Sequence, residues 1–345
     1  MSWIESLAGA AGAAERALQL ANEEGPVPHS AGEKKMAEAL VRARAENPWF
    51  TPENIRNALS GLAYMLRPEA VREWAGRYEN LPKRYTAKKV GIVAAGNIPM
   101  VAFHDILCAL AAGHKAVVKL SAQDRHLLPA FFALVEESGQ TGAFELTWTE
   151  GQLGETDAVI ATGSNNTARY FEYYFGNQPH IIRKNRNTAA VLDGTETEEE
   201  LYALGADIFS YFGLGCRNVS KIYVPEDYDL DRFFNAVFPF RDIVNHHKYA
   251  NNYDYYKALW LMNGEELLDN NFLLLRRSEA LAAPPGVLYY ERYGEAEALR
   301  KKLREQADEI QCIVSHEDVP FGKSQRPELR DYADGIDTMD FLLKI

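Results

Sequence analysis

An alternation of short β-rich runs with helical runs, which begins at Lys88, limits the possible folds of this chain more than any other feature. The runs are, in order, KVGIVAA, VAFHDILCALAAG, KAVVKL, HLLPAFFALVEESG, FELTWT and DAVIATG. Strands that alternate with helices at this spacing predict a parallel sheet whose faces are covered by helices. We therefore expect an α/β protein.

The sequence before residue 80 is predicted to be helical. Thr51 can cap a helix with Pro52 at its first position, and apolar residues then recur on one face at Ile55, Leu59, Leu62 and Leu66. After Asp193, the acidic stretch TETEEELYALGADIFSYFG predicts another helix, and a strand-like GVLYYERY follows later. We divide the chain into four segments, 1–85, 86–193, 194–319 and 320–345.

The charge balance argues against some classes of partner. With 345 residues, of which 47% are hydrophobic, the chain can bury a large core. Its 37 Lys and Arg against 49 Asp and Glu give a net charge of -12, which disfavours general binding to nucleic acids or anionic membranes. The first twenty residues include Glu5 and Glu15 and lack a basic leader or a long apolar stretch. We expect neither a signal peptide nor a membrane span, and therefore a cytoplasmic protein.

Three cysteines lack any metal-like spacing and are too few for a disulfide framework. Cys108 lies in the apolar run ILCALAA and fits a core position, and Cys312 in IQCIVS fits a core position on a strand. His246 and His247 have no partner at metal-ligand spacing, so we expect no metal site. Each cysteine is either a core thiol or a reactive one.

Cys216 is the cysteine whose surroundings suggest reactivity. It lies in YFGLGCRNVSKIYVP, where Gly213 and Gly215 leave room for a substrate and the cations Arg217 and Lys221 can raise the thiolate fraction. The alternative is a small buried residue between a helix and a strand, which is the more common situation for a lone cysteine.

Three polar or glycine-rich turns follow predicted strands, at 94–99, 119–124 and 161–166. In α/β folds ligands gather at the carboxyl ends of parallel strands. Helices that start after Asn97 and Gly163 would offer backbone N–H groups to an anion. The chain has no GxGxxG at a strand-to-helix turn, so the standard dinucleotide fingerprint is missing.

Five stretches, taken in order, resemble the aldehyde dehydrogenase superfamily. They are VGIVAAGNIPM, LAAGHKAVVKLS, IATGSNNTARYF, YFGLGCRNVSKIYVP and VPFGKSQRPELRDYADGIDTMDFL. They are most similar to its acyl-CoA reductase branch, the long-chain fatty-acid reductase (LuxC) family, over residues 45 to the C-terminus. The resemblance implies two Rossmann-like parallel-sheet domains, an NAD(P)-binding domain at 86–193 and a catalytic domain at 194–319, with a helical N-terminal lead-in.

The resemblance also implies roles for individual residues. Cys216 falls at the position of the nucleophile, and Asn97 at the position of the asparagine that stabilises the oxyanion. The implied cofactor-binding residues contact the adenosine ribose, the pyrophosphate and the nicotinamide ribose, and are Lys119, Ser121, Gly163, Ser164 and Glu279. The missing GxGxxG agrees with this superfamily, which holds its dinucleotide differently.

The sequence departs from the aldehyde-oxidising pattern in the stretch IIRKNRNTAAV. Ile182 falls near the position of the glutamate that activates water for deacylation. An enzyme that exchanges thioesters with CoA does not need that base, because a thiolate is itself a competent nucleophile and leaving group. Arg183, Lys184 and Arg186 could receive the phosphates of CoA or NADPH, or could equally form a solvated loop. His180 could assist proton transfer, although a structural role is more common.

The sequence therefore predicts an NAD(P)H-dependent acyl-CoA reductase that uses NADPH or NADH and acts on a fatty acyl-CoA. The alternatives are CoA-acylating aldehyde oxidation, reduction of another activated acyl donor, or a catalytically silent binding scaffold. The resemblance implies a homodimer, and an acyl-transfer partner protein is possible. The aromatic residues at 249–260 could line an acyl tunnel, although aromatic residues at helical spacing are more often core.

Overall fold

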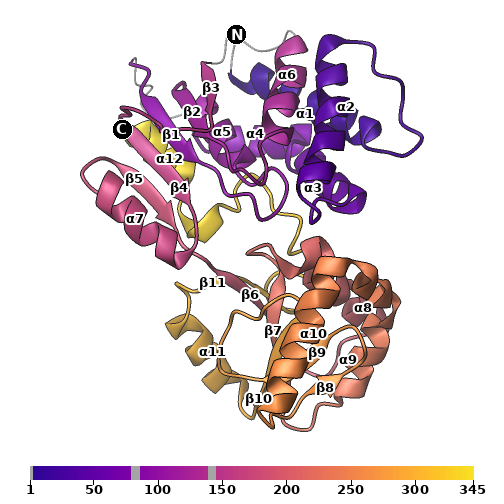
Figure 1. The fold of residues 1–345 in the computed structure, drawn as a ribbon. Coiled ribbons are helices and arrows are strands. Elements are labelled where there is room, and N and C mark those ends of the chain that lie inside the picture. Colours follow the sequence, from indigo (N-terminus) through magenta and orange to yellow (C-terminus); the bar gives the residue numbers. More distant parts are fainter. Residues whose placement is uncertain (1–2, 79–85, 139–144) are drawn as a thin grey trace. The chain divides into compact units, whose positions relative to one another are not determined.

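The computed structural model describes residues 3–78, 86–138 and 145–345 (Figure 1). The chain forms two compact units. Unit 1 comprises Met1–Lys184 and Arg326–Ile345, and unit 2 comprises Asn185–Gln325. Unit 2 is thus an insertion in the chain of unit 1. Within the described residues, no helix combines the length and the apolar composition that a membrane span requires.

Among the described residues before the first strand of unit 1, the chain is mostly helical, as predicted. The helices are α1 (Trp3–Leu20), α2 (Ala31–Glu46), α3 (Pro52–Met65) and α4 (Pro68–Gly76). The Thr51 side chain accepts a hydrogen bond from the Asn54 N–H and so caps α3, with Pro52 at its start. The predicted apolar face of this helix is buried, at Ile55, Leu59, Leu62 and Leu66. The sequence prediction for this helix is confirmed.

In the described part of unit 1, five strands form a sheet in the order β3-β2-β1-β4-β5, and each of these pairs is parallel. The strands are β1 (Lys89–Val93), β2 (Lys115–Lys119), β3 (Leu146–Thr149), β4 (Ala158–Thr162) and β5 (His180–Arg183). The helices between them are α5 (Phe103–Ala111), α6 (Leu127–Glu137) and α7 (Asn165–Phe175). The predicted alternation of strands and helices, and the parallel sheet, are confirmed.

The core of unit 1 contains side chains from both ends of its chain. Ile92, Val118 and Ile160 are fully buried on the central strands, where each such side chain contributes about 1.5–3 kcal/mol of burial free energy. The C-terminal segment adds the 3₁₀ helix η3 (Ala333–Gly335) and α12 (Thr338–Lys344), with core residues Leu329, Tyr332, Met339 and Leu342. The last residues of the chain therefore complete a core that the first residues begin.

The sheet of unit 2 has six strands in the order β11-β6-β7-β10-β9-β8. They are β6 (Asn187–Val191), β7 (Val219–Pro225), β8 (Leu268–Asp269), β9 (Leu274–Arg277), β10 (Val287–Tyr293) and β11 (Ile310–Val314). Only the pairing of β8 with β9 is antiparallel among these strands. The helices are α8 (Glu198–Phe209), η1 (Ser210–Gly213), α9 (Leu230–Val237), η2 (Phe238–Asn245), α10 (His247–Met262) and α11 (Ala296–Glu305).

Alternate residues of β7 pack on opposite faces of this sheet. Ile222 and Val224 share a buried cluster with residues of α8 and α9, whereas Tyr223 lies with Leu299 and Leu303 of α11. Helices therefore cover both faces, as in other parallel sheets. The aromatic segment expected at 249–260 forms most of α10, where Tyr249, Tyr253 and Trp260 are buried and Tyr255 is exposed. Its buried aromatic side chains serve as core.

The division of the chain differs from the one expected from the sequence. β6 pairs with β7 and β11, so the residues from Asn185 onward belong to unit 2, whereas the sequence placed the boundary after Asp193. The C-terminal part of unit 1 begins at Arg326 rather than at residue 320. Strand pairing decides the first boundary, and hydrogen bonds from Gly322 and Ser324 to Asp207 of α8 hold the residues before the second in unit 2. The sequence pattern reveals neither set of partners.

Candidate functional site

The sheet of unit 1 brings the three polar turns to one edge. These turns follow β2, β1 and β4, which are consecutive neighbours in the sheet and run parallel. The strand order also changes direction here, because β2 and β3 lie on one side of β1 and β4 and β5 on the other. The carboxyl ends of strands at such a switch point are the usual ligand site of an open α/β sheet.

Gly96 lets the first two turns approach closely. A Cβ atom at Gly96 would lie 2.4 Å from the Ser121 Oγ, a distance at which no side chain fits. The next residue, Asn97, is exposed, and Lys119 is half-buried at the end of β2. The structure thus brings the turn that carries Asn97 against Ser121, two residues after Lys119.

Asp124 holds the far side of the Asn97 turn. Its Oδ2 accepts a hydrogen bond of 2.6 Å from the Met100 N–H, and Met100 has a left-handed φ of 63°. Burial raises the pKa of the Asp124 carboxyl to about 6, although this hydrogen bond acts to lower it. The expected helix start directly after Asn97 is wrong, because the turn continues and α5 begins at Phe103. Sequence reasoning missed Asp124, whose partner lies on a different strand end.

The third turn has the predicted helix start. Ser164 is the exposed N-cap of α7, and its hydroxyl accepts a hydrogen bond of 3.2 Å from the Thr167 N–H. A Cβ atom at Gly163 would lie only 3.0 Å from Phe171, so glycine fits best there. The first N–H groups of a helix form a binding site for phosphate groups. Together with Lys119 and Ser121, these groups fit the phosphates and ribose of a dinucleotide.

The expected basic cluster after β5 is not one cluster. Arg183 is 5% exposed, its Nη1 pairs with Asp105 of α5, and its Nη2 donates to the Thr338 Oγ1 at 2.9 Å. Its guanidinium is therefore a buried link within unit 1, so for Arg183 both the phosphate contact and the solvated loop are wrong. Lys184 is exposed, whereas Arg186 donates to the carbonyl oxygens of Ala307 and Ile310 in unit 2.

His180 and Ile182 occupy β5 itself. The His180 Nδ1 lies 2.8 Å from the Gln178 carbonyl oxygen, and its Nε2 lies 3.7 Å from a carboxylate oxygen of Glu172. These contacts agree with the structural role that is more common for such a histidine. Ile182 is half-buried in the strand, near the position where the resemblance to aldehyde-oxidising enzymes implies a glutamate.

Cys216 lies in an exposed turn between η1 and β7 in unit 2. Tyr211, Phe212 and Gly213, just before it, all have left-handed φ angles, of 52°, 58° and 77°. Such a conformation costs about 1–2 kcal/mol at each residue that has a side chain. The chain therefore makes a strained reversal before it presents this cysteine at the surface, and the alternative of a buried small residue is wrong.

Asn218 fixes the strained turn from its buried side. It is 2% exposed, and its Nδ2 donates to the carbonyl oxygens of Asp207 at 3.0 Å and Ser210 at 2.7 Å. Its Oδ1 accepts from the Gly215 N–H at 2.8 Å, and its own N–H donates to the Gly215 carbonyl at 3.0 Å. Both ends of the amide are used. Sequence reasoning missed this residue, because its partners become close only when the turn has formed.

Thr188 at the start of β6 contacts both cysteines of this region. Its hydroxyl donates to the Cys216 carbonyl oxygen at 3.0 Å and lies 3.2 Å from the Cys312 Sγ. Cys312 is half-buried on the edge strand β11, which differs from the core position expected for it. Cys108 is fully buried in α5, and burial raises the pKa of its thiol, so its predicted core role is confirmed.

The cation Lys221 has a different partner from the one expected. Its side chain is fully buried, and its Nζ lies 2.7 Å from the Glu291 Oε2 and 2.9 Å from the Glu279 carbonyl oxygen. Burial lowers the pKa of Lys221, although the ion pair with Glu291 acts to raise it. The Lys221 ammonium is thus committed to Glu291 rather than to a thiolate. Glu279 contributes its backbone to this contact, while its side chain is exposed.

Asp207 ties the segment VPFGKS to α8. It is fully buried and accepts hydrogen bonds from the Gly322 N–H at 2.6 Å, the Ser324 N–H at 3.0 Å and the Ser324 hydroxyl at 2.7 Å. Burial raises the pKa of the Asp207 carboxyl to about 6 and outweighs these donors. Because the Asp207 carbonyl also receives Asn218, the VPFGKS segment and the Cys216 turn are attached to the same helix end.

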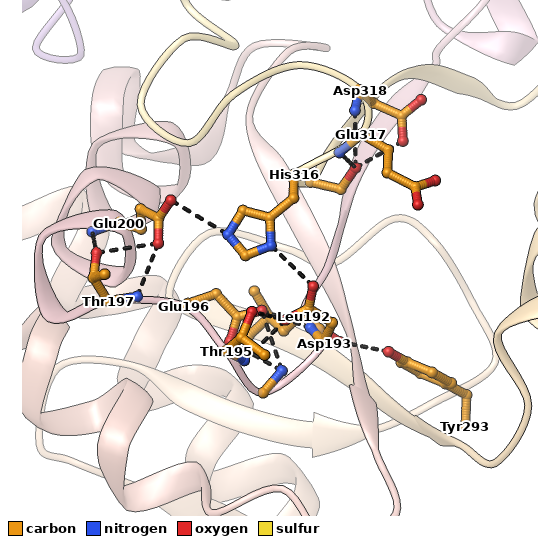
Figure 2. A network of polar contacts seen from close by, with 12 residues as sticks. Leu192, Asp193, Thr195, Glu196, Thr197, Glu200, Tyr293, His316, Glu317 and Asp318 are labelled. Carbon is orange, nitrogen blue, oxygen red and sulfur yellow. Dashed lines mark hydrogen bonds and ion pairs between the residues drawn. The ribbon is translucent and has the colours of Figure 1, made fainter.

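A second polar cluster lies beyond the carboxyl ends of β6 and β11 (Figure 2). His316 lies between two carboxylates, with its Nδ1 2.9 Å from Asp193 and its Nε2 3.3 Å from Glu200. The hydrogen bond with Asp193 raises the pKa of His316. Within the described residues, ligand atoms of Asp193, Glu196 and His316 lie within 4.8 Å of one another. Contacts inside the cluster engage these groups, and we assign no metal to it.

Comparisons with solved structures identify the fold. No protein-family model matches the sequence, and no curated protein matches it. The similar structures include aldehyde dehydrogenase 21 from Physcomitrella patens in complex with succinate, at a TM-score of 0.60 and 14% identity over 92% of this chain and 74% of that one. NADP-dependent glyceraldehyde-3-phosphate dehydrogenase from Bacillus halodurans, complexed with NADP, has a TM-score of 0.58 and 14% identity over 90% and 78%.

A third similar structure is the NAD+ complex of an aldehyde dehydrogenase from Bacillus cereus, with a TM-score of 0.55 and 14% identity over 89% of this chain and 72% of that one. The chain therefore has the aldehyde dehydrogenase fold, with two Rossmann-like parallel-sheet units. The fold class expected from the sequence is confirmed. At this identity the likeness concerns the fold alone, and function has to be argued from the site.

Proposed function

We propose that this protein is an NADPH-dependent reductase that converts a fatty acyl-CoA to the aldehyde through a thioester on Cys216. The observation that carries the proposal is the exposed Cys216 at a strained turn, which Asn218 and Thr188 hold from the buried side. Backbone strain of this kind is common at functional sites. The aldehyde dehydrogenase fold supports oxidoreductase chemistry as an analogy.

In the proposed reaction the Cys216 thiolate attacks the acyl carbonyl carbon. The new S–C bond forms as the C–S bond to CoA breaks, and CoA leaves as a thiolate. When bound, NADPH supplies the hydride that reduces the resulting thioester carbonyl. The thiohemiacetal on Cys216 then collapses, which releases the aldehyde and returns the electron pair to the Cys216 sulfur.

The proposed oxyanion donors are the Asn97 side-chain amide and the Cys216 backbone N–H. Loss of one such donor typically costs about 3–4 kcal/mol of transition-state stabilisation. Lys119, Ser121, Gly163 and Ser164 are the proposed cofactor-binding residues of unit 1. Their support is the close packing of the Gly96 turn on Ser121 and the helix start capped by Ser164.

Reduction is favoured over hydrolytic aldehyde oxidation by the residue at position 182. Hydrolysis of a thioester needs a base that activates water, and Ile182 provides none. Exchange with CoA needs no such base. Lys184, which is exposed, remains a proposed contact for a phosphate of CoA or NADPH, and so does Arg186, which is partly engaged by Ala307 and Ile310. Glu279 remains a proposed contact of the nicotinamide ribose.

The test is NADPH oxidation by the purified protein with acyl-CoA thioesters of increasing chain length. We expect Cys216→Ala to lose at least 1,000-fold in rate, because removal of a nucleophile can cost about 10⁶-fold. Cys108→Ser, at a buried thiol, and Cys312→Ala, at a half-buried one, are the matched controls. Both should keep the activity of the parent. If Cys216→Ala consumes NADPH as fast as the parent, the mechanism is wrong.

The same assay separates the rival functions. Acyl phosphates and carrier-bound acyl thioesters replace acyl-CoA to test other donors, and aldehyde with CoA and NADP+ tests the reverse direction. A protein that turns over none of these, and whose Cys216 no acylating probe labels, would be a binding scaffold with this fold. That result would overturn the proposal.

A further inference from the structure

The side chains of Asn218 and Thr188 fix the backbone around Cys216 on two sides. On one side, the Asn218 amide reaches the carbonyl oxygens at the end of α8, which lack partners inside the helix. On the other side, the hydroxyl of Thr188, near the start of β6, donates a hydrogen bond to the carbonyl oxygen of Cys216 itself. The Cys216 backbone is thus tied to a helix end and to a strand.

These hydrogen bonds stabilise a strained conformation that the chain would otherwise leave. Three consecutive left-handed residues, Tyr211 to Gly213, persist only where surrounding contacts over-determine the backbone. Asn218 provides such contacts, because its side chain joins residues on both sides of the reversal, Ser210 and Gly215. A turn that served only to connect α8 with β7 would not need a strained route that ends at an exposed cysteine.

We infer that Asn218 and Thr188 are positioning residues that hold the Cys216 backbone in the orientation in which its thiol accepts an acyl group. This inference rests on the proposed function, since it assigns a purpose to the turn only if Cys216 is acylated. Neither residue touches the reacting atoms. Attack on a carbonyl requires an aligned sulfur and an aligned oxyanion donor, and small errors in either reduce the rate strongly.

Two reactions of the same thiol distinguish positioning from mere exposure. Acylation by a 4-nitrophenyl ester needs carbonyl attack at an aligned site, whereas alkylation by iodoacetamide needs only an accessible thiolate. Both are measured on the full chain, with mass spectrometry to locate each label on Cys216. We expect Thr188→Val and Asn218→Ala to lower the acylation rate about 10- to 100-fold and to change the alkylation rate less than threefold.

Two variants serve as controls. Thr188→Ser keeps the hydroxyl and should retain at least half of the parent acylation rate. Ser220→Ala removes a hydrogen bond of 2.8 Å from β7 to the Leu281 carbonyl and a 3.5 Å contact with the Thr188 carbonyl. It leaves the Thr188 hydroxyl in place and should leave both rates unchanged. If Asn218→Ala does not fold, Thr188→Val carries the test, because valine has nearly the same shape as threonine.

The inference is overturned if Thr188→Val acylates as fast as Ser220→Ala, or if acylation and alkylation fall together. In the latter case the residues keep the thiol exposed and do not orient it. A parent protein whose Cys216 resists the ester overturns both the inference and the proposed function. If the ester acylates Cys216 but no acyl-CoA is reduced, only the proposed function fails, and the rate ratio still decides the inference.

Discussion

At the residue scale, two buried aspartates fix backbone segments: Asp124 holds the turn that carries Asn97, and Asp207 holds the VPFGKS segment. Asp124 accepts the Met100 N–H in unit 1, and Asp207 accepts donors from Gly322 and Ser324 in unit 2. Burial raises the pKa of both carboxyls to about 6. Ionisation of each buried carboxyl therefore lowers the free energy of unfolding, while its hydrogen bonds define the local backbone geometry.

The raised pKa of Asp124 predicts a pH dependence of stability. Its carboxyl has a pKa of about 6 in the folded chain against 3.8 as the reference for the unfolded chain, so the folded state binds the proton more tightly. The contribution of Asp124 to stability is therefore largest below pH 4 and falls as the pH rises to 6. Asparagine at this position cannot ionise but keeps an oxygen acceptor for Met100.

We expect the stability of Asp124→Asn to rise relative to the parent by about 2 kcal/mol between pH 4 and pH 7, since most of the roughly two units of pKa shift falls in this window. Urea unfolding at a series of pH values, followed by circular dichroism, measures this difference. Asp308→Asn, at an exposed position of unit 2, is the control. Parallel pH profiles of parent and Asp124→Asn would contradict the assignment.

At the element scale, one buried ion pair joins a helix, a strand and the C-terminal helix. Arg183 of β5 pairs with Asp105 of α5 and donates to Thr338 at the start of α12. Replacement of Arg183 by methionine leaves the Asp105 carboxylate buried without its cation, which typically costs about 3–5 kcal/mol. We expect this loss in urea unfolding, and reduced hydrogen-exchange protection in α12.

The double variant Asp105→Leu with Arg183→Met checks the physical reason. Because it removes both charges together, it should be more stable than Arg183→Met alone. Lys184→Met is the matched control, since it removes the adjacent, exposed cation. Equal losses in the single and double variants would show that packing, and not the unpaired charge, causes the destabilisation.

The elements show which parts of the structure could be predicted from the sequence. The apolar runs of β1, β2 and β4 and the Thr51 cap of α3 were predicted because their signals are local. The turn after β1 was predicted, but its extent was not, since its left-handed Met100 depends on Asp124 of another strand end. Charge pattern alone suggested a basic loop at Arg183, because its partner Asp105 is far away in the sequence.

The candidate site shows the same contrast. Glycines and cations near Cys216 left a buried residue as the more common alternative, the family resemblance implied a reactive thiol, and the exposed turn agrees with the latter. The hydrogen bonds of Asn218 and Thr188 could not be predicted, because they join residues that only the folded chain brings together. Likewise, Lys221 is a cation close to Cys216 in sequence, but strand alternation directs its ammonium to Glu291.

At the scale of the whole molecule, the chain leaves unit 1, forms unit 2 and returns to unit 1 (Figure 1). The returning segment is firmly attached, since the Trp74 Nε1 donates to the Tyr332 hydroxyl at 2.7 Å and the Tyr78 hydroxyl donates to Asp337 at 2.7 Å. Leu342 is fully buried. Unit 1 therefore depends on residues that follow unit 2 in the sequence.

We expect removal of residues 326–345 to destabilise unit 1 and to leave unit 2 folded. The deletion takes away Leu329, Met339 and Leu342 from one core and no buried residue from the other. Hydrogen exchange read by peptide should show loss of protection in α4 and α5 and normal protection in α8 and β7. Tyr332→Phe, which removes only a hydroxyl, should have a much smaller effect. Equal loss in both units would contradict the division.

The return of the chain also sets an order of events during synthesis. A ribosome completes all of unit 2 before it makes the residues that close the core of unit 1, although it began with unit 1. Domains fold as they emerge, so the second unit can reach its final state while the first still exposes the apolar surface that Leu329, Met339 and Leu342 will cover. A chaperone that binds the growing chain would therefore bind the part of unit 1 that precedes unit 2.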